Sequence, residues 1–304
     1  MVDLVVVGSV AFDSIETPYG SRERVLGGSA CYFSYVASFF CKVGMVGIVG
    51  KDFPDAFLQP LRDRGVDTSG LRRDEERNSF FWKGRYEGDM NVAQTVDVEL
   101  NVLGDFMPEL PKEYRKAPYV FLANWHPATQ LSVLKQFDTA PLVCSDSMNM
   151  WIENESDTLN EVLSNVDGFF CNDAEAKMLA GTPNLIQAGR NIMSKVKGFV
   201  GLKKGEHGSI LFHREGLVGL PAFPADEVLD PTGAGDSFAG GFMGSMARLD
   251  KSDIAAMKES VVYGTAMASF TVEGFGLEKL FTLEEHAISQ RRKQLLDFLP
   301  AADR

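Results

Sequence analysis

The chain has 304 residues, of which 45% are hydrophobic and 24% are charged, the balance of an ordinary folded protein. This length suits one α/β domain with an appendage, and we expect a single domain over residues 1–304. The net charge of −12 argues against a nucleic-acid polymer as partner, because non-specific binding to phosphate backbones depends on clustered Lys and Arg. A small anionic ligand remains compatible with this charge, since local backbone dipoles can bind it.

The four cysteines, Cys31, Cys41, Cys144 and Cys171, include no CxxC pair, and three of them lie in apolar runs. We expect them to be small core side chains in a reducing compartment. The N-terminal segment MVDLVVVGS has no basic region and only a short apolar run, so it predicts a strand and not a signal peptide. No uncharged apolar stretch is long enough to span a bilayer, and we therefore expect a cytoplasmic protein with no membrane partner.

Short apolar or β-branched runs alternate along the chain with longer segments of helical period. The predicted strands cover residues 4–7, 45–49, 119–122, 142–144, 168–171, 199–202 and 209–212. The predicted helices cover residues 29–41, 57–64, 130–137, 175–179, 236–249 and 283–298. This alternation predicts βαβ units and a mainly parallel sheet with helices on both faces.

Residues 79–103 interrupt the alternation with two strand-like stretches and no helical pattern. In the second stretch Val96, Val98, Leu100 and Val102 alternate with polar residues, which predicts a strand with one apolar face. The polar segment EGDMN joins it to the first stretch, SFFWKGRY. A two-stranded ribbon is only marginally stable alone, so we expect this apolar face to be buried over a ligand cleft, against other strands or in a homodimer.

The strongest motif is DPTGAGDSF at residues 230–238, which leads directly into an amphipathic helical segment. The small residues at 233–235 let the backbone approach a ligand closely, and the helix start offers unpaired N–H groups and a positive dipole end. Such a turn can stabilise the charge that develops on a transferred phosphoryl group. Asp236 could accept a proton from an attacking hydroxyl, or it could simply complement the helix dipole as a first-turn acid.

The longer string DPTGAGDSFAGGF closely resembles the C-terminal motif of the ribokinase-like, or PfkB-type, carbohydrate kinase family, and further resemblances run from about residue 4 to residue 290. The resemblance implies a three-layer α/β/α fold with a mainly parallel central sheet. A small β lid, from residues 14–26 and 79–103, would close over the acceptor. It also implies a kinase that transfers the γ-phosphoryl group of ATP to a hydroxymethyl group, with Mg²⁺ and, in many members, a monovalent cation such as K⁺.

The resemblance also implies roles for particular residues. The family's anion hole corresponds to Gly233, Ala234 and Gly235, and its catalytic base to Asp236. The substrate side corresponds to Asp13, which matches a substrate-hydroxyl acid, and to the hinge and contact motif of Gly27 and Gly28; Asn124 would be a further hydrogen-bonding group near a sugar acceptor. Each also has a plain structural interpretation, since Asp13 could be a loop acid and a Gly-Gly pair can be a flexible turn before a helix.

The nucleotide side of the resemblance rests on two short segments. Asn172 and Glu175 resemble the family's N-x-x-E motif, which implies contact with Mg²⁺ through water for Glu175, although an acid-rich helix start is an ordinary alternative. The segment KKGEHG is similar to a G-x-x-G segment beside the phosphates, where Lys204 could contact phosphate or be a solvated turn lysine. The implied ATP-binding residues are Asn172, Lys204, Gly205, Gly208 and Thr232, and Asp230 would border a monovalent-cation site together with residues 269–276.

Two departures from the family pattern concern the acceptor. Tyr32 stands where the family often has an Asn that contacts substrate, and CSDSMNMWIE lacks the arginine of members that phosphorylate keto-sugar acids. The resemblance implies that the acceptor is either a sugar or a nucleoside, since both kinds of kinase in the family share the motifs above, and the larger number of sugar kinases in the family favours a sugar. A distant alternative is a non-catalytic ligand-binding protein of the same fold. The aromatic residues that could stack a base or pack against a sugar are Tyr32, Phe81, Trp82, Tyr86 and Trp125.

Overall fold

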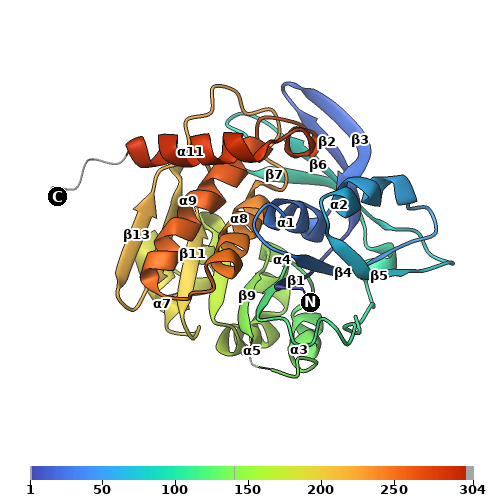
Figure 1. The fold of residues 1–304 in the computed structure, drawn as a ribbon, viewed down its shortest axis with the longest axis horizontal. Helices are drawn as coiled ribbons and strands as arrows, with labels where there is room; N and C mark the ends of the chain where they lie inside the picture. The colour runs from blue at the N-terminus through green and yellow to red at the C-terminus, as the bar shows by residue number, and fades with distance from the viewer. Residues whose placement is uncertain (1, 140, 299–304) are drawn as a thin grey trace.

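The computed structural model describes residues 2–139 and 141–298 and contains two β-sheets (Figure 1). The predicted domain limits, residues 1 and 304, lie outside the described residues. One sheet has nine strands and is flanked by helices, and the other has four strands. We call them the large sheet and the small sheet.

The large sheet has the strand order β13-β12-β11-β10-β9-β8-β1-β4-β5. Its strands are β1 (Leu4–Val7), β4 (Val43–Val49), β5 (Asp67–Arg73), β8 (Tyr119–Leu122), β9 (Leu142–Asp146), β10 (Gly168–Asn172), β11 (Phe199–Lys203), β12 (Ser209–His213) and β13 (Gly216–Leu220). All neighbours from β11 to β5 pair in parallel, whereas β12 and β13 are antiparallel. Parallel strands end at the same edge of a sheet, so the loops that follow them converge there.

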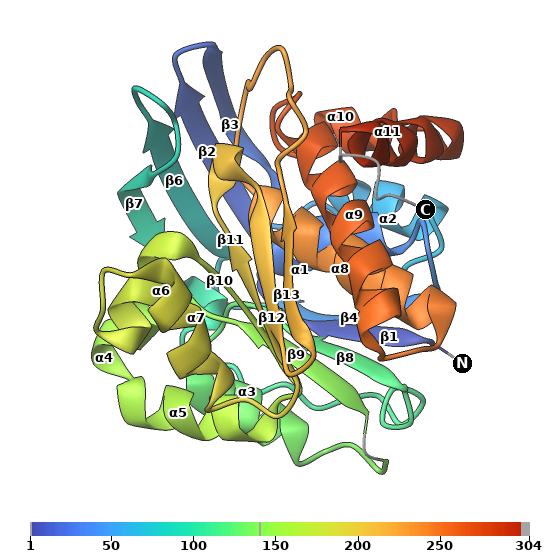
Figure 2. The same cartoon turned by 90° about the vertical axis from the view of Figure 1, so that its left-hand side faces the viewer.

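Helices cover both faces of the large sheet (Figure 2). One face carries α1 (Ser29–Ala37), α2 (Gln59–Asp63), α8 (Ala234–Leu249), α9 (Ile254–Thr271), α10 (Glu278–Phe281) and α11 (Glu285–Asp297). The other carries α3 (Pro127–Leu134), α4 (Asn149–Asn154), α5 (Ser156–Asn165), α6 (Asp173–Ala180) and α7 (Leu185–Met193). The predicted three-layer arrangement is therefore confirmed.

Strand β1 shows how the sequence produces two cores. Leu4 and Val6 belong to the apolar cluster under α8 and α9, and Val5 and Val7 belong to the cluster under α3 and α5. Successive side chains of a strand point to opposite faces, so an unbroken apolar run is what a strand covered on both sides requires. Every strand predicted for the large sheet is present, although the predicted helix at 57–64 is a 3-10 turn, η1 (Asp55–Leu58), followed by the short α2.

The small sheet has the order β3-β2-β6-β7, and it follows β1 after three residues. Its strands are β2 (Ala11–Thr17), β3 (Gly20–Gly27), β6 (Phe80–Tyr86) and β7 (Ala93–Glu99). Strands β6 and β7 pair antiparallel, which confirms the predicted hairpin within 79–103, and β2 with β3 covers the predicted lid segment 14–26. Figure 2 shows this sheet standing to one side of the large sheet.

The prediction that Val96, Val98, Leu100 and Val102 form one buried face is wrong for the single chain. Val96, Val98 and Leu100 are 48%, 49% and 43% exposed, respectively. Strand β7 already ends at Glu99, and Val102 lies in the 3-10 turn η2 (Asn101–Leu103), where it is buried in the core. Asn101 has a positive φ of 46°, so the backbone turns and the alternation of faces does not continue past the strand.

Two simpler expectations concern the cysteines and the membrane. All four cysteines are free; Cys31, Cys144 and Cys171 are buried and Cys41 is partly buried, so the prediction of core side chains is confirmed for three of them. Burial raises the pKa of the Cys31 thiol, which keeps it neutral. Within the described ranges, no helix is both long and apolar enough to cross a bilayer.

Candidate active site

Polar side chains gather at the carboxyl ends of β9, β10 and β11. Asp146, Asn172 and Lys203 are the last residues of these three strands. Asn172 pairs with Lys203, and Asp146 lies opposite Phe170 one strand away. Alternation along the strands assigns all three residues to the face that packs against α8, because Phe170, two positions before Asn172, belongs to that core. The beginning of α8 and the end of the sheet therefore enclose one site.

The turn before α8 needs glycine at its first position. Gly233 is the N-cap of α8 and has a φ of 74°, a left-handed conformation that favours glycine. A Cβ at Gly233 would lie 2.3 Å from the aromatic ring of Tyr32, so the ring packs directly on the turn. Ala234 and Gly235 begin the helix, and the first N–H groups of a helix have no earlier turn to pair with. These residues form a backbone cradle with a positive dipole end.

Asp230 holds this turn to a second loop. Its carboxylate is fully buried, with Oδ1 accepting from the N–H of Thr232 at 2.9 Å and Oδ2 from the N–H of Gly276 at 2.8 Å. Burial raises the pKa of Asp230, and these hydrogen bonds oppose that effect. Thr232 also bonds through its hydroxyl to the Tyr86 hydroxyl at 3.1 Å, which ties the turn to strand β6 of the small sheet.

Two carboxyl groups of the site have raised pKa values. Asp236 lies in the first turn of α8, where burial raises its pKa to about 6; the Lys203 ammonium lowers it and the Glu175 carboxylate raises it further. Asp13 on β2 is 4% exposed, and burial raises its pKa to about 7, against a hydrogen bond from the backbone N–H of Gly28. The negative charges of Asp230 and, to a smaller extent, Asp236 add to this rise. An acid with a pKa near 6 is suited to accept a proton at neutral pH.

The absence of a side chain at Gly27 leaves room for the carboxylate of Asp13. A Cβ at Gly27 would lie 2.0 Å from Oδ2 of Asp13, so any side chain there would displace the carboxylate. Gly28 has a φ of 92°, and a Cβ there would approach the carbonyl oxygen of Ser9 to 2.5 Å. The Gly-Gly pair thus allows the start of α1 to approach the small sheet closely, and the substrate contact expected of it stays a prediction.

Where β10 ends and α6 begins, Asn172 and Glu175 form a capping box. Oδ1 of Asn172 accepts from the N–H of Glu175 at 2.8 Å, and Oε2 of Glu175 accepts from the N–H of Asn172 at 2.8 Å. Both residues therefore have the structural role of helix caps. Burial raises the pKa of Glu175, and the nearby Lys203 ammonium opposes that rise.

The predicted phosphate segment forms a tight turn after β11. The N–H of Lys204 donates to the carbonyl oxygen of Gly208 at 2.8 Å, and Gly205 and Gly208 have φ values of 53° and 78°. A Cβ at Gly208 would lie 2.1 Å from the carbonyl oxygen of Leu220, so the turn requires glycine there. The lysine beside α8 is Lys203, since a Cβ at Gly235 would lie 2.8 Å from its Nζ.

The side chain of Asn124, after β8, is engaged by its neighbours. Its Oδ1 accepts from Trp151 Nε1 at 3.1 Å, and its Nδ2 lies 3.2 Å from the sulfur of Met148. Its backbone N–H donates to Asp146, whose pKa burial raises well above the usual range. Asp146 and Lys203 are the two site residues that the sequence did not single out. The signal that could have found them is their position as last residues of parallel strands, on the face toward α8.

A model of the pfkB family carbohydrate kinases matches residues 1–281. The chain belongs to this family. It is 30% identical to the cytidine kinase of Thermococcus kodakarensis over 253 residues, which cover 82% of this chain and 90% of that protein. It is also 26% identical to a nucleoside kinase of Methanocaldococcus jannaschii over 280 residues, covering 87% of this chain and 84% of that protein.

Solved structures share the fold of this pfkB kinase. The nucleoside kinase of Methanocaldococcus jannaschii matches with a TM-score of 0.79 and 21% identity over 96% of this chain and 98% of that one. Arabidopsis thaliana ribokinase, complexed with ribose and ATP, matches with a TM-score of 0.78 and 21% identity over 95% and 98% of the two chains. The predicted family, fold and enzyme class are confirmed: the protein is an ATP-dependent phosphotransferase with an alcohol group as acceptor.

Proposed function

We propose that this pfkB kinase phosphorylates the ribosyl hydroxymethyl group of a nucleoside, with Asp236 as general base. The observation that carries the kinase chemistry is the pair of Asp236 and Asp13 beside the cradle of residues 233–235. The nucleoside is favoured over the sugar expected from family size because the cytidine kinase and a nucleoside kinase are among the similar proteins. Since the donor is ATP and the cysteines are free, we place the reaction in the cytoplasm.

The proposed transfer is in line. The acceptor hydroxyl oxygen forms a bond to the γ-phosphorus of ATP. At the same time the bond between the γ-phosphorus and the β,γ-bridging oxygen breaks, and ADP leaves. Asp236 takes the hydroxyl proton, and with a pKa of about 6 it is mostly ionised and ready to do so at pH 7. The backbone of 233–236 and the dipole of α8 stabilise the transferring phosphoryl group. Asp13 binds a neighbouring acceptor hydroxyl.

The protein would hold Mg²⁺ mainly through water, because within the described residues no three Asp, Glu, His or Cys side chains lie close enough together to bind a metal ion directly. When bound, Mg²⁺ would neutralise charge on the β- and γ-phosphate oxygens. Glu175 uses Oε2 within its capping box, which leaves Oε1 to hold a water ligand of the ion, in keeping with the preference of Mg²⁺ for water and carboxylate oxygens. For K⁺, both oxygens of Asp230 already accept backbone N–H groups, so backbone carbonyls of residues 269–276 and of the Asp230 loop would be the ligands.

We further propose that the small sheet is the lid of the site. The small sheet contributes Asp13 to the site. Its residue Tyr86 is hydrogen-bonded to Thr232 in the turn before α8, which we call the catalytic turn. Beneath that contact Ile15, Tyr86, Met90 and Phe275 form a separate apolar cluster. A lid of this kind excludes water, which would otherwise compete with the acceptor as nucleophile.

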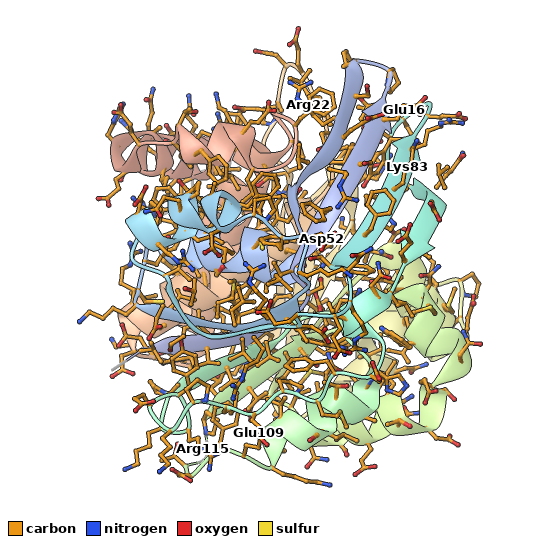
Figure 3. The ribbon with its side chains drawn as sticks, turned by 90° about the vertical axis from the view of Figure 1, so that its right-hand side faces the viewer. Glu16, Arg22, Asp52, Lys83, Glu109 and Arg115 are labelled. Carbon is orange, nitrogen blue, oxygen red and sulfur yellow. The ribbon has the colours of Figure 1, made fainter. Side chains whose placement is uncertain are left out.

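The base of the small sheet is fixed by Asp52, which Figure 3 shows between that sheet and the main body. Oδ1 of Asp52 accepts from the N–H of Ser79 at 2.7 Å and from its hydroxyl at 2.8 Å. Oδ2 of Asp52 accepts from Arg24 at 3.1 Å. These bonds lower the pKa of Asp52 although burial raises it, so the carboxylate stays ionised and holds β3 and the start of β6 together.

The acceptor class is tested by ADP release from ATP and Mg²⁺ with panels of nucleosides and free sugars. We expect the best nucleoside to exceed ribose and the hexoses by about 100-fold or more in kcat/KM, because a site built to hold a base loses those contacts with a free sugar. Asp236→Asn, prepared identically, measures contaminating kinases. The second candidate, supported by 24% identity to the ribokinase of Lactococcus lactis over 298 residues, is a sugar; turnover of ribose with no response to any nucleoside would establish it instead.

The exposed face of β7 leads us to propose a homodimer through the small sheet. Strand β7 pairs only with β6 among the described strands, and Val96 and Val98 are about half exposed on it. An edge strand with exposed apolar side chains is a template for pairing with another chain. Light scattering should show a dimer that Val98→Glu converts to a monomer. Leu217→Glu, on the exposed edge strand β13, is the control and should leave the mass unchanged; a monomeric wild type contradicts the proposal.

A further inference from the structure

Lys203 points from the end of β11 toward α8. Phe199, four residues earlier on the same face of that strand, packs against Phe242 of α8, with ring centroids 5.4 Å apart. Alternation along the strand therefore directs Lys203 toward α8 as well. Lys204 follows the strand, and its backbone closes the turn to Gly208. Both lysine side chains are partly exposed, and Lys203 is the one that reaches the first turn of α8.

The Lys203 ammonium lies beside the positive end of helix α8, a position that is unfavourable for a cation unless an anion is also present. Its Nζ is 2.8 Å from the position of a Cβ on Gly235, in the first turn of α8. The start of a helix is its positive end, so a cation there works against the dipole. Burying an ammonium group also costs free energy unless opposite charge compensates it. Two positive groups that converge on one point suit a polyanion such as a transferring phosphoryl group.

Carboxylates compensate the ammonium in the free protein. Burial lowers the pKa of Lys203, but Asp146 on β9, Glu175 on α6 and Asp236 on α8 raise it overall, with a smaller contribution from Cys171 on β10. The neighbouring acids therefore favour the charged form of Lys203. The alternative to a ligand contact is that Lys203 serves only to neutralise these acids and to keep Asp236 ionised.

We propose that Lys203 is a catalytic residue whose ammonium contacts the oxygens of the transferring phosphoryl group at the first turn of α8. Lys203 thereby replaces Lys204, which the family resemblance assigned to ATP binding and which makes no such contact in this proposal. This inference rests on the proposed phosphoryl transfer and assigns a further residue to it. When ATP binds, the phosphate oxygens take over the pairing with the ammonium that the carboxylates provide in the free protein. The same cation then stabilises the charge that develops during transfer.

The test compares Lys203→Met with Lys204→Met, which removes the same charge one residue away. We expect Lys203→Met to lower kcat by about 100-fold or more, as loss of one stabilising donor does, and Lys204→Met to stay within about threefold of wild type. Calorimetric titration with ATP, without acceptor, should show about tenfold weaker binding for Lys203→Met only. Lys203→Arg, which keeps the charge, should recover part of the ATP affinity, and thermal melting establishes that each variant is folded.

The pH dependence of kcat distinguishes a direct contact of Lys203 with the phosphoryl group from an indirect effect of Lys203 on the ionisation of Asp236. Removing Lys203 raises the pKa of Asp236, because the ammonium lowers it. If that were its whole role, kcat of Lys203→Met would return to the wild-type value at about pH 9, where Asp236 is ionised in both proteins. We expect the loss to persist there. Recovery at high pH, or unchanged ATP affinity, overturns the proposal. The ATP titration needs no acceptor, so a wild type that phosphorylates neither nucleosides nor sugars would reject the proposed function and leave the Lys203 test intact.

Discussion

Asp236→Asn should lower kcat by about 10²- to 10⁴-fold, the usual cost of losing a positioned general base. Asn has the size of Asp but cannot take the proton of the attacking hydroxyl at neutral pH. ATP binding should change little. Burial raises the pKa of Asp236 to about 6, so its ionised form destabilises the fold as the pH rises from about 4 through 6. The melting temperature of the Asn variant should therefore equal or exceed that of wild type at pH 8, and the difference should shrink at pH 4.

The contrary interpretation makes Asp236 an ordinary first-turn acid, whose replacement costs at most about 1 kcal/mol of stability and leaves turnover alone. Asp253 is a matched control, because it caps α9 by accepting from the N–H of Ala256 at 2.8 Å. Asp253→Asn should leave kcat unchanged. Steady-state kinetics with the true acceptor, together with thermal melts, decide the matter. A turnover of Asp236→Asn within threefold of wild type is incompatible with the role of base.

Gly233→Ala should damage both the fold and the chemistry. The left-handed φ of 74° costs an alanine about 1 to 2 kcal/mol. The new Cβ would also lie 2.3 Å from the ring of Tyr32, and relieving such a clash typically costs about 1 to 3 kcal/mol more. Because the turn must move away from Tyr32, kcat should fall by about 10- to 100-fold, since misplacing a catalytic group by 1 Å has effects of that size.

Gly65→Ala is the control for the backbone contribution alone. Gly65 has a similar φ of 82°, and a Cβ there would meet nothing within 4 Å. The free energy of unfolding of this variant should fall only by the cost of placing alanine in a left-handed conformation, and the variant should keep full activity. Chemical denaturation and kcat for the two variants give the comparison. Equal stabilities and equal activities for Gly233→Ala and Gly65→Ala would mean that the packing of Tyr32 on the turn is unimportant.

The parts of the fold that could be predicted are those with a strong local pattern. Strand β1 is an unbroken apolar run, and the start of α8 carries small residues followed by an apolar stripe. Helix α9 escaped prediction because it lies between α8 and α11, so its buried residues occupy most of its circumference and leave no stripe of one period. The burial of Val102 in a different element from Val98 depends on the end of β7 at Glu99, which the alternating sequence does not mark.

The candidate site shows the same division. The motif residues, such as Asp13 and the turn at 233–235, were predicted because the motifs that contain them resemble those of the kinase family. The choice between Lys203 and Lys204 could not be made from two identical neighbours, since it depends on where β11 ends and on which face α8 covers. The role of Asp146 could not be predicted either, because it is the parallel register of β9 and β10 that brings its carboxylate near Lys203.

If the small sheet is the proposed lid, the hydrogen bond between the Tyr86 and Thr232 hydroxyls would govern the entry of substrate and the release of product. It fastens the covering strands to the catalytic turn, so entry of an acceptor and exit of its phosphate ester would require the same contact to part. One such bond contributes only about 0.5 to 1.5 kcal/mol, but parting also exposes the apolar cluster around Phe275. In that case the closed conformation is the stable one in the free protein. Release of the bulkier, more charged product would then be the rate-limiting step of the catalytic cycle.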